Sequence, residues 1–132
     1  MKILFIPRSH IWPSLTDEQI DAMKRAGATE IIQTEDREEQ FRAIYDADAL
    51  IGPIDPELFE RAGRLVWVQA LSSGVDALLF QEFVESDITL TSEKGLVGPH
   101  LADHAFGLLL SLTRSILWAG RQRRWENRME MR

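Results

Sequence analysis

Short apolar runs alternate with amphipathic segments along residues 2–91, and this alternation constrains the fold more than any other feature of the sequence. Each run has the length and composition of a buried strand bounded by polar or turn-forming residues. Strands that alternate with helical segments pair in parallel through right-handed crossovers. The runs that predict strands cover residues 2–7, 30–33, 49–51, 65–70 and 88–91.

Helix signals occupy the segments between these runs. Thr16 and Gln19 have the spacing of a capping box, and Asp55 precedes a proline that suits the first position of a helix. We therefore expect an α/β domain over residues 1–97, with a flavodoxin-like five-stranded parallel sheet and helices on both faces. The helices are expected at residues 16–27, 36–45 and 55–63.

The segment after Pro99 differs from the rest. It reaches Leu117 without a helix breaker, and its three consecutive leucines at 108–110 make the apolar face wider than one neighbour can cover. Residues 98–132 are therefore predicted to form a long C-terminal linking helix with a basic tail. An exposed face of this kind favours association, so we expect a homodimer through the helix at residues 99–125.

Composition excludes several classes of protein. The 132 residues are 45% hydrophobic and 27% charged, with no cysteine, which rules out disulfides and thiolate zinc sites. No apolar run approaches the length of a membrane span and no secretory signal is visible, so a cytoplasmic protein without membrane contact is expected. The net charge is −6, although six arginines follow residue 113. This basic tail could contact nucleic acid, dock on an acidic partner or simply be a solvated helix end; the acidic remainder argues against nucleic acid.

In open parallel sheets, ligands bind beyond the carboxyl ends of the strands. The turn after the fourth run, Ser72-Ser73-Gly74-Val75, offers successive backbone N–H groups that could hold a carboxylate or phosphate. The structural alternative is an ordinary strand-to-helix turn with serine capping. The loop at Gly52 is expected to border the same cleft.

Other sites that this fold class supports are not predicted here. Arg8 and Gly52 stand where a phospho-receiver domain needs acidic residues, and neither a flavin phosphate loop nor a GxGxxG dinucleotide turn occurs. His100 and His104 share a helix face at metal-ligand spacing, but a helix-surface pair is the favoured interpretation. Neither histidine has a serine or cysteine to activate, so we predict no catalytic, cofactor-binding or metal-binding residue in this chain.

Two stretches resemble the D-isomer-specific 2-hydroxyacid dehydrogenases. The first is the strand and turn at residues 65–76, and the second runs from residue 88 through Gly98-Pro99 and Ala102-Asp103-His104 into the leucine-rich helix. Residues 121–125 are similar to the basic stretch that leads into the family's nucleotide domain. The family usually has glutamate where this chain has Asp103, and the first 60 residues agree in layout only.

The resemblance implies the substrate domain and first linking helix of an NAD- or NADP-dependent enzyme, truncated before the nucleotide-binding domain. Such an enzyme passes hydride between the nicotinamide and a small 2-oxo or 2-hydroxy acid. In the family, backbone N–H groups at the positions of Ser72, Ser73, Gly74 and Val75 hold the substrate carboxylate. The family's arginine, glutamate and histidine lie beyond Arg132 and do not match His100 or His104, so the chain alone is expected to be inactive and to bind no cofactor. The alternative is a stand-alone, non-catalytic binding or dimerisation module that uses the helix at 99–125.

Overall fold

A computed structural model describes residues 1–8 and 12–122 of the chain. The chain divides into two compact units, residues 1–94 and residues 95–132. Each is described by itself. The elements of the first unit are β1 (Lys2–Phe5), α1 (Asp17–Arg25), β2 (Glu30–Gln33), α2 (Arg37–Ile44), β3 (Ala49–Ile51), α3 (Pro56–Glu60), β4 (Trp67–Ala70), the 3₁₀ helix η1 (Asp76–Leu78), α4 (Gln81–Val84) and β5 (Thr89–Ser92).

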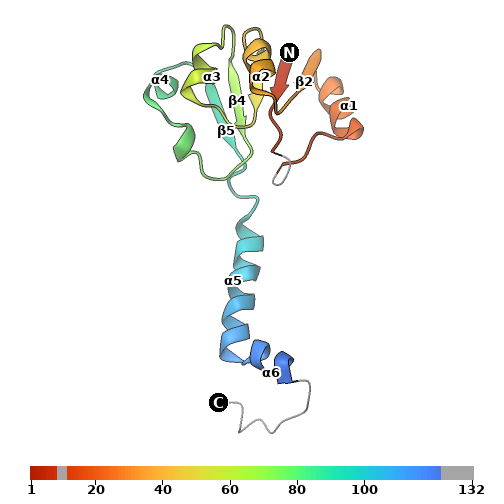
Figure 1. Cartoon of the computed structure of the whole chain (residues 1–132), viewed down its shortest axis with the longest axis vertical. Helices are drawn as coiled ribbons and strands as arrows, with labels where there is room; N and C mark the ends of the chain where they lie inside the picture. Colours follow the sequence, from red (N-terminus) through yellow and green to blue (C-terminus); the bar gives the residue numbers. More distant parts are fainter. Residues whose placement is uncertain (9–11, 123–132) are drawn as a thin grey trace. The chain divides into compact units, whose positions relative to one another are not determined.

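The first unit contains a five-stranded sheet in the order β2-β1-β3-β4-β5 (Figure 1). All four neighbouring pairs are parallel, and Leu4, Leu50 and Val68 lie opposite one another in register across the three central strands. This strand order is that of flavodoxin-like doubly wound sheets. The fold class predicted from the alternation of apolar runs and helices is therefore confirmed.

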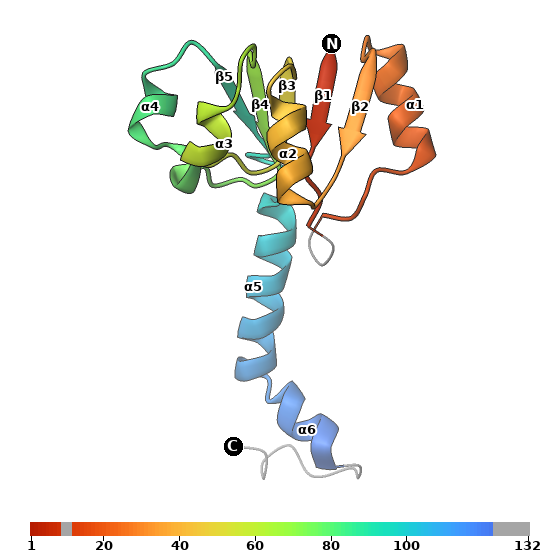
Figure 2. The ribbon, with the colours of Figure 1, turned by 45° about the horizontal axis from the view of Figure 1, so that its top comes forward.

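Right-handed crossovers determine which face each helix covers. The chain moves from β1 to β2 in one direction and from β2 through β3, β4 and β5 in the other, so α1 lies on the face opposite α2, α3 and α4. Figure 2 shows α2 and α3 in front of the central strands. The core fills this layer, and among residues 1–8 and 12–122 it contains no charged side chain. Its fully buried residues include Leu4, Ile44, Leu50, Leu58 and Val68.

Local sequence signals fix the starts of the longer helices. The Thr16 hydroxyl accepts a hydrogen bond from the Gln19 backbone N–H, and the Gln19 side chain accepts one from the Thr16 N–H, so the capping box is present. Asp36 and Asp55 cap α2 and α3 in the same manner through their carboxylates. Each cap supplies an acceptor to a backbone N–H that has no partner within its own helix.

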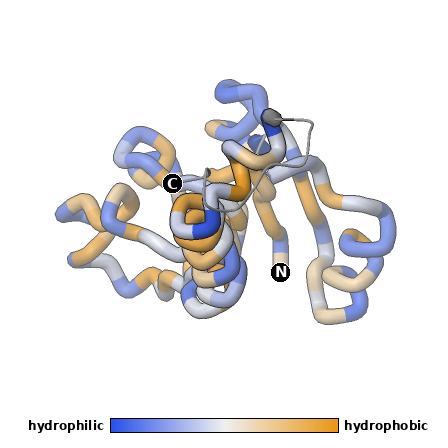
Figure 3. The backbone as a smooth tube through the Cα atoms, turned by 90° about the horizontal axis from the view of Figure 1, so that it is seen from below, coloured by the Kyte–Doolittle hydropathy of each residue, from blue (hydrophilic) through white to orange (hydrophobic). Residues whose placement is uncertain are grey.

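The second unit consists of α5 (Gly98–Thr113) and α6 (Ile116–Gln122). The uninterrupted helix expected from Pro99 to Leu117 is therefore wrong, because the helix breaks at Ser115, which adopts a φ of 52°. The Thr113 hydroxyl donates back to the Leu109 carbonyl at 3.0 Å, a contact that often bends helices. Apolar residues run along these helices (orange in Figure 3), and Leu112 is 80% exposed. No helix within the described ranges is long and apolar enough to cross a membrane.

Candidate functional site

The loops that follow β1, β3 and β4 meet at a cavity of about 260 Å³. Because parallel strands end at one edge of the sheet, residues far apart in the sequence come together there. The wall combines one cation, one indole ring, small apolar side chains and two residues of the predicted turn. The lining residues are Arg8, Trp12, Gly52, Pro53, Ala70, Leu71, Ser72, Gly74, Ala77 and Leu78.

The two serine side chains of the turn at residues 72–75 stabilise the conformation of the turn. The Ser72 hydroxyl donates to the Gly74 carbonyl at 2.7 Å, and the Ser73 hydroxyl donates to the Glu93 carbonyl at 3.2 Å. The Glu93 N–H donates to the Ser72 carbonyl, which ties the turn to the end of β5. Val75 precedes η1 and provides no side-chain cap. Neither serine therefore caps a helix as the structural alternative expected, since both hydroxyls bind carbonyls instead of the N–H groups of a helix.

The backbone N–H groups of the turn are the donors that this arrangement leaves available. No hydrogen bond to a described residue uses the N–H groups of Ser72, Ser73, Gly74 or Val75. Gly74 is exposed, and a Cβ built there would meet only the Asp76 carboxylate, at 3.9 Å. Buried or half-buried N–H groups require an acceptor, and an anion supplies one. The turn can therefore donate to a small carboxylate.

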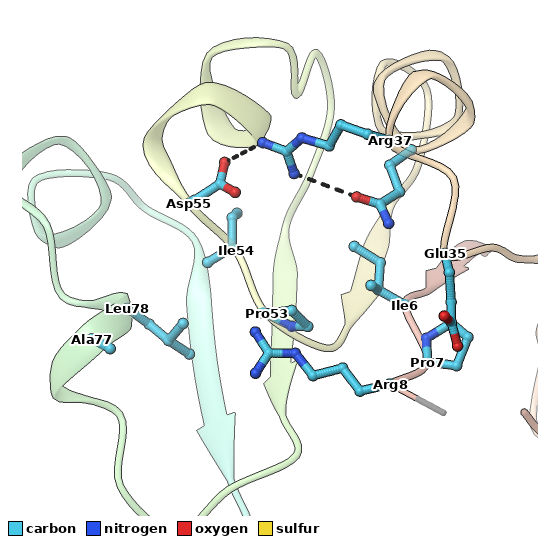
Figure 4. Close-up of a pocket in the computed structure, with 11 residues that line it drawn as sticks. Ile6, Pro7, Arg8, Glu35, Arg37, Pro53, Ile54, Asp55, Ala77 and Leu78 are labelled. Carbon is cyan, nitrogen blue, oxygen red and sulfur yellow. Dashed lines mark hydrogen bonds and ion pairs between the residues drawn. The ribbon is translucent and has the colours of Figure 1, made fainter. Parts of the chain in front are cut away.

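A second cavity of about 670 Å³ lies against the first, and the two share Arg8, Pro53, Ala77 and Leu78 (Figure 4). Its charged residues beyond Arg8 are Glu35, Arg37 and Asp55. The Arg37 guanidinium contacts the Asp55 carboxylate at 2.8 Å and the Glu57 carboxylate at 3.2 Å. Arg37 is thus occupied by two carboxylates that belong to the fold.

The pKa values of this ion pair move apart. Burial alone would raise the pKa of Asp55, but the hydrogen bonds from Arg37 and from the Leu58 N–H together place that pKa below its usual range. The hydrogen bond to Asp55 likewise raises the pKa of Arg37 despite its partial burial. Both groups therefore stay charged at neutral pH, and neither is suited to exchange a proton there.

The structure brings together some of the sequence-predicted residues and separates others. Ser72 and Gly74 line the cavity, whereas Ser73 and Val75 stand next to it without lining it. His100 and His104 are exposed on α5, and residues 1–8 and 12–122 contain no cluster of three potential metal ligands. His10 and the basic stretch from residue 123 onward lie outside the described residues.

Sequence reasoning missed the role of Trp12. Its backbone forms an antiparallel bridge with Arg8, with both N–H···O distances at 2.8 Å, and the Arg8 guanidinium carbon is 5.6 Å from the centroid of the indole ring. The Pro7-Arg8 pair was visible as a strand end. Nothing in the spacing of residues 8 and 12, however, indicated that the two would pair.

A dinucleotide does not fit the residues of this edge. Dinucleotide sites place a glycine-rich turn at the start of a helix that follows the first strand, so that the pyrophosphate reaches backbone N–H groups. In this chain β1 is followed by Pro7 and Arg8, and the first cap in that connection, Thr16, uses its side chain on Gln19. We therefore assign no part of a nucleotide site to this edge.

The fold is an α/β domain in which the turn at residues 72–75 lines a cavity at the strand ends. Comparisons with known proteins extend this description. No protein-family model matches the chain. It is 34% identical to the glyoxylate reductase of Korarchaeum cryptofilum over 82 residues, covering 59% of this chain and 25% of that protein. It is 29% identical to the glyoxylate reductase of Pyrococcus furiosus over 118 residues, covering 84% of this chain and 35% of that protein. The chain thus spans between a quarter and about a third of these curated relatives.

Solved structures agree with this assignment of the fold. A D-isomer-specific 2-hydroxyacid dehydrogenase family protein from Aeromonas salmonicida superposes with a TM-score of 0.69 at 24% identity, covering 96% of this chain and 41% of that chain. An acyclic imino acid reductase in complex with NADPH and D-Arg gives 0.70 at 21% identity, covering 92% and 40%. An NAD-dependent formate dehydrogenase from Staphylococcus aureus in complex with NAD gives 0.66 at 21% identity, covering 99% and 44%. Together with the curated relatives, these matches confirm the resemblance to the D-isomer-specific 2-hydroxyacid dehydrogenases.

Proposed function

We propose that residues 1–94 are the substrate-binding part of an NAD- or NADP-dependent D-2-hydroxyacid dehydrogenase. The observation that carries the proposal is the turn at residues 72–75, whose N–H groups have no acceptor among the described residues and whose Gly74 faces a cavity. The similarity to two glyoxylate reductases supports it, because glyoxylate is a small 2-oxo acid with one carboxylate. The nucleotide-binding part corresponds to the portion of those relatives that this chain does not span.

The contribution of this chain to the reaction is binding and orientation. The N–H groups of the turn hold the substrate carboxylate, which fixes the position of the adjacent C2 atom. Backbone donors suit this task because their geometry does not depend on flexible side chains. We assign proton and hydride transfer to the portion of the enzyme that this chain does not span, so the chain by itself is expected neither to bind the nicotinamide nucleotide nor to turn over.

Titration of the chain with glyoxylate or pyruvate, followed by amide NMR, tests the proposal. We expect binding with a dissociation constant on the order of a millimolar, and the largest shifts at residues 72–75. In Gly74→Ala the added methyl group takes up space beside the N–H groups of the turn that is open in the original chain, so we expect the affinity to fall by about tenfold or more.

Gly107→Ala is the matched control, because this glycine lies on α5 with nothing near its Cβ position. The Gly107→Ala variant should bind pyruvate with the same affinity as the original chain. Shifts centred away from the turn, or equal affinities in the two alanine variants, would contradict the proposal. Oxidation of NADH by the purified chain with glyoxylate would contradict the expected inactivity.

The second unit favours a further, non-catalytic role. Phe106, Leu109 and Leu112 recur at helical spacing on α5 and are all more than half exposed. We propose that the segment at residues 99–125 pairs with the same segment of a second chain through the exposed apolar stripe on α5, because exposed apolar patches of this kind mark interaction surfaces.

The mass in solution tests this pairing. The mass of the protein in solution should be twice the 15.1 kDa of one chain. The double variant Leu109→Glu/Phe106→Glu should have the mass of a single chain. Arg42→Glu, an equally exposed change on α2, is the control and should leave the mass doubled. If the unaltered protein had the mass of a single chain, the proposed pairing would be wrong.

A further inference from the structure

Arg8 stands out among the charged residues of the strand-end edge because it lines both cavities. Its backbone is fixed by the paired hydrogen bonds with Trp12, and its guanidinium lies against the indole ring. Figure 4 shows the side chain extending from the end of β1 beneath Pro53, toward the segment that carries Ala77 and Leu78. The cation is therefore held in the cavity wall by its own strand end and by an aromatic neighbour.

The other charges of this edge do not neutralise Arg8. Arg37 is occupied by Asp55 and Glu57, so those carboxylates already have a partner. Glu35 also lines the larger cavity, and Figure 4 draws its carboxylate beside Pro7, on the opposite side of the view from the Arg8 guanidinium. Within residues 1–8 and 12–122, no carboxylate lies within ion-pair distance of Arg8.

An arginine in this position can bind an anionic group that belongs to the ligand. The planar fork of arginine matches the two oxygens of a carboxylate. Arg8 and the turn residues Ser72 and Gly74 all line the smaller cavity. Pro53, Ala77 and Leu78 line it as well and offer apolar surface for methylene groups. One ligand with an anionic group at each end could therefore contact both Arg8 and the turn.

We propose that Arg8 binds a second carboxylate of the substrate, so that the site prefers 2-oxo or 2-hydroxy dicarboxylic acids to monocarboxylic ones. This inference rests on the proposed function, because it takes the turn at residues 72–75 as the site of the first carboxylate. It adds a specificity-determining residue and narrows the substrate class. The cation–aromatic contact with Trp12 positions the guanidinium, while its N–H groups remain available to the ligand.

Three probes separate the contributions of charge and chain length. Pyruvate carries the 2-oxo acid group alone, 2-oxobutyrate adds one methylene group, and 2-oxoglutarate adds a second carboxylate. We expect the chain to bind 2-oxoglutarate about tenfold more tightly than 2-oxobutyrate at low salt, because the added contact is charge-assisted. Raising the salt concentration should reduce this ratio, since Arg8 is exposed to solvent.

The variant Arg8→Met keeps an unbranched side chain against Trp12 and removes the charge. It should bind 2-oxoglutarate no more tightly than 2-oxobutyrate. Arg42→Met, the matched change at an exposed position of α2, should retain the full preference. Thermal unfolding of both variants confirms that they fold.

The outcomes distinguish this inference from the proposed function. If both 2-oxo acids shift the amides of residues 72–75 and bind equally, the turn binds carboxylates but Arg8 does not select the substrate. A preference that survives in Arg8→Met also overturns the role of Arg8. If none of the probes affects the turn, the proposed function fails as well.

Discussion

Replacing Gly52 with alanine is expected to lower the free energy of unfolding by about 2–4 kcal/mol. Gly52 follows β3 with a φ of 137°, a backbone conformation that side chains rarely adopt. A Cβ built there lies 3.0 Å from the Ile6 carbonyl oxygen and 3.1 Å from the Ile6 Cβ, and Ile6 directly follows β1. The substitution therefore combines backbone strain with a close contact that β1 can relieve only by moving. Urea or thermal unfolding measures the loss.

Two further glycines separate these causes. Gly27→Ala introduces strain alone, because Gly27 has a φ of 111° but nothing within 4 Å of its Cβ position. Gly74→Ala introduces neither, since its φ lies outside the positive range and its surroundings are open; its stability should be unchanged or higher by about 0.4–1 kcal/mol. We expect Gly52→Ala to be the most damaging of the three. Equal losses at Gly52 and Gly27 would show that the contact with Ile6 has no cost.

Much of the fold follows from local signals in the sequence. The strands at 30–33 and 49–51 have the bounds expected from their apolar runs. For the central strand β3, no exposed polar position blurs its ends, because its three residues are buried or half-buried. The strand expected at 65–70 begins only at Trp67. Val66 is 56% exposed, although its N–H donates to the Asp48 carbonyl and its carbonyl accepts from the Thr89 N–H. Capping residues placed the starts of α1, α2 and α3 within a residue, as each cap acts on its own helix.

The features that sequence did not predict depend on tertiary contacts. The break at Ser115 needs a positive φ in a residue other than glycine, which no composition rule indicates. The bridge between Arg8 and Trp12 joins residues only four apart, at a spacing that carries no turn signal. The pairing of Arg37 with Asp55 joins two segments whose approach is set by the sheet. The turn at 72–75 could be recognised by residue type. The residue types do not indicate, however, that both serine hydroxyls bind carbonyls and that the backbone N–H groups lack an acceptor among the described residues.

Replacing Phe83 with alanine is expected to destabilise the first unit by about 3–5 kcal/mol. Phe83 is 3% exposed on α4, and its ring meets Phe59 edge-on at 5.9 Å and Phe80 at 5.6 Å. These three rings hold α3 and α4 together. Removing the Phe83 ring leaves a cavity that relaxation of the surrounding structure fills only in part. In a domain of this size, each kcal/mol of lost stability lowers Tm by about 4–8 °C.

The same substitution connects stability to the site. Phe80 and Phe83 anchor the chain just after η1, which itself begins directly after the turn at residues 72–75. A loosened anchor lets the turn sample conformations in which its N–H groups diverge, so the affinity for pyruvate should fall even at temperatures where Phe83→Ala is folded. Val84→Ala, a 61% exposed position on the same helix, is the control and should change the stability by no more than about 0.5 kcal/mol. If Phe83→Ala bound pyruvate as well as Val84→Ala does while folded, the turn would owe its shape to the Ser73 contact with Glu93 and not to the aromatic cluster.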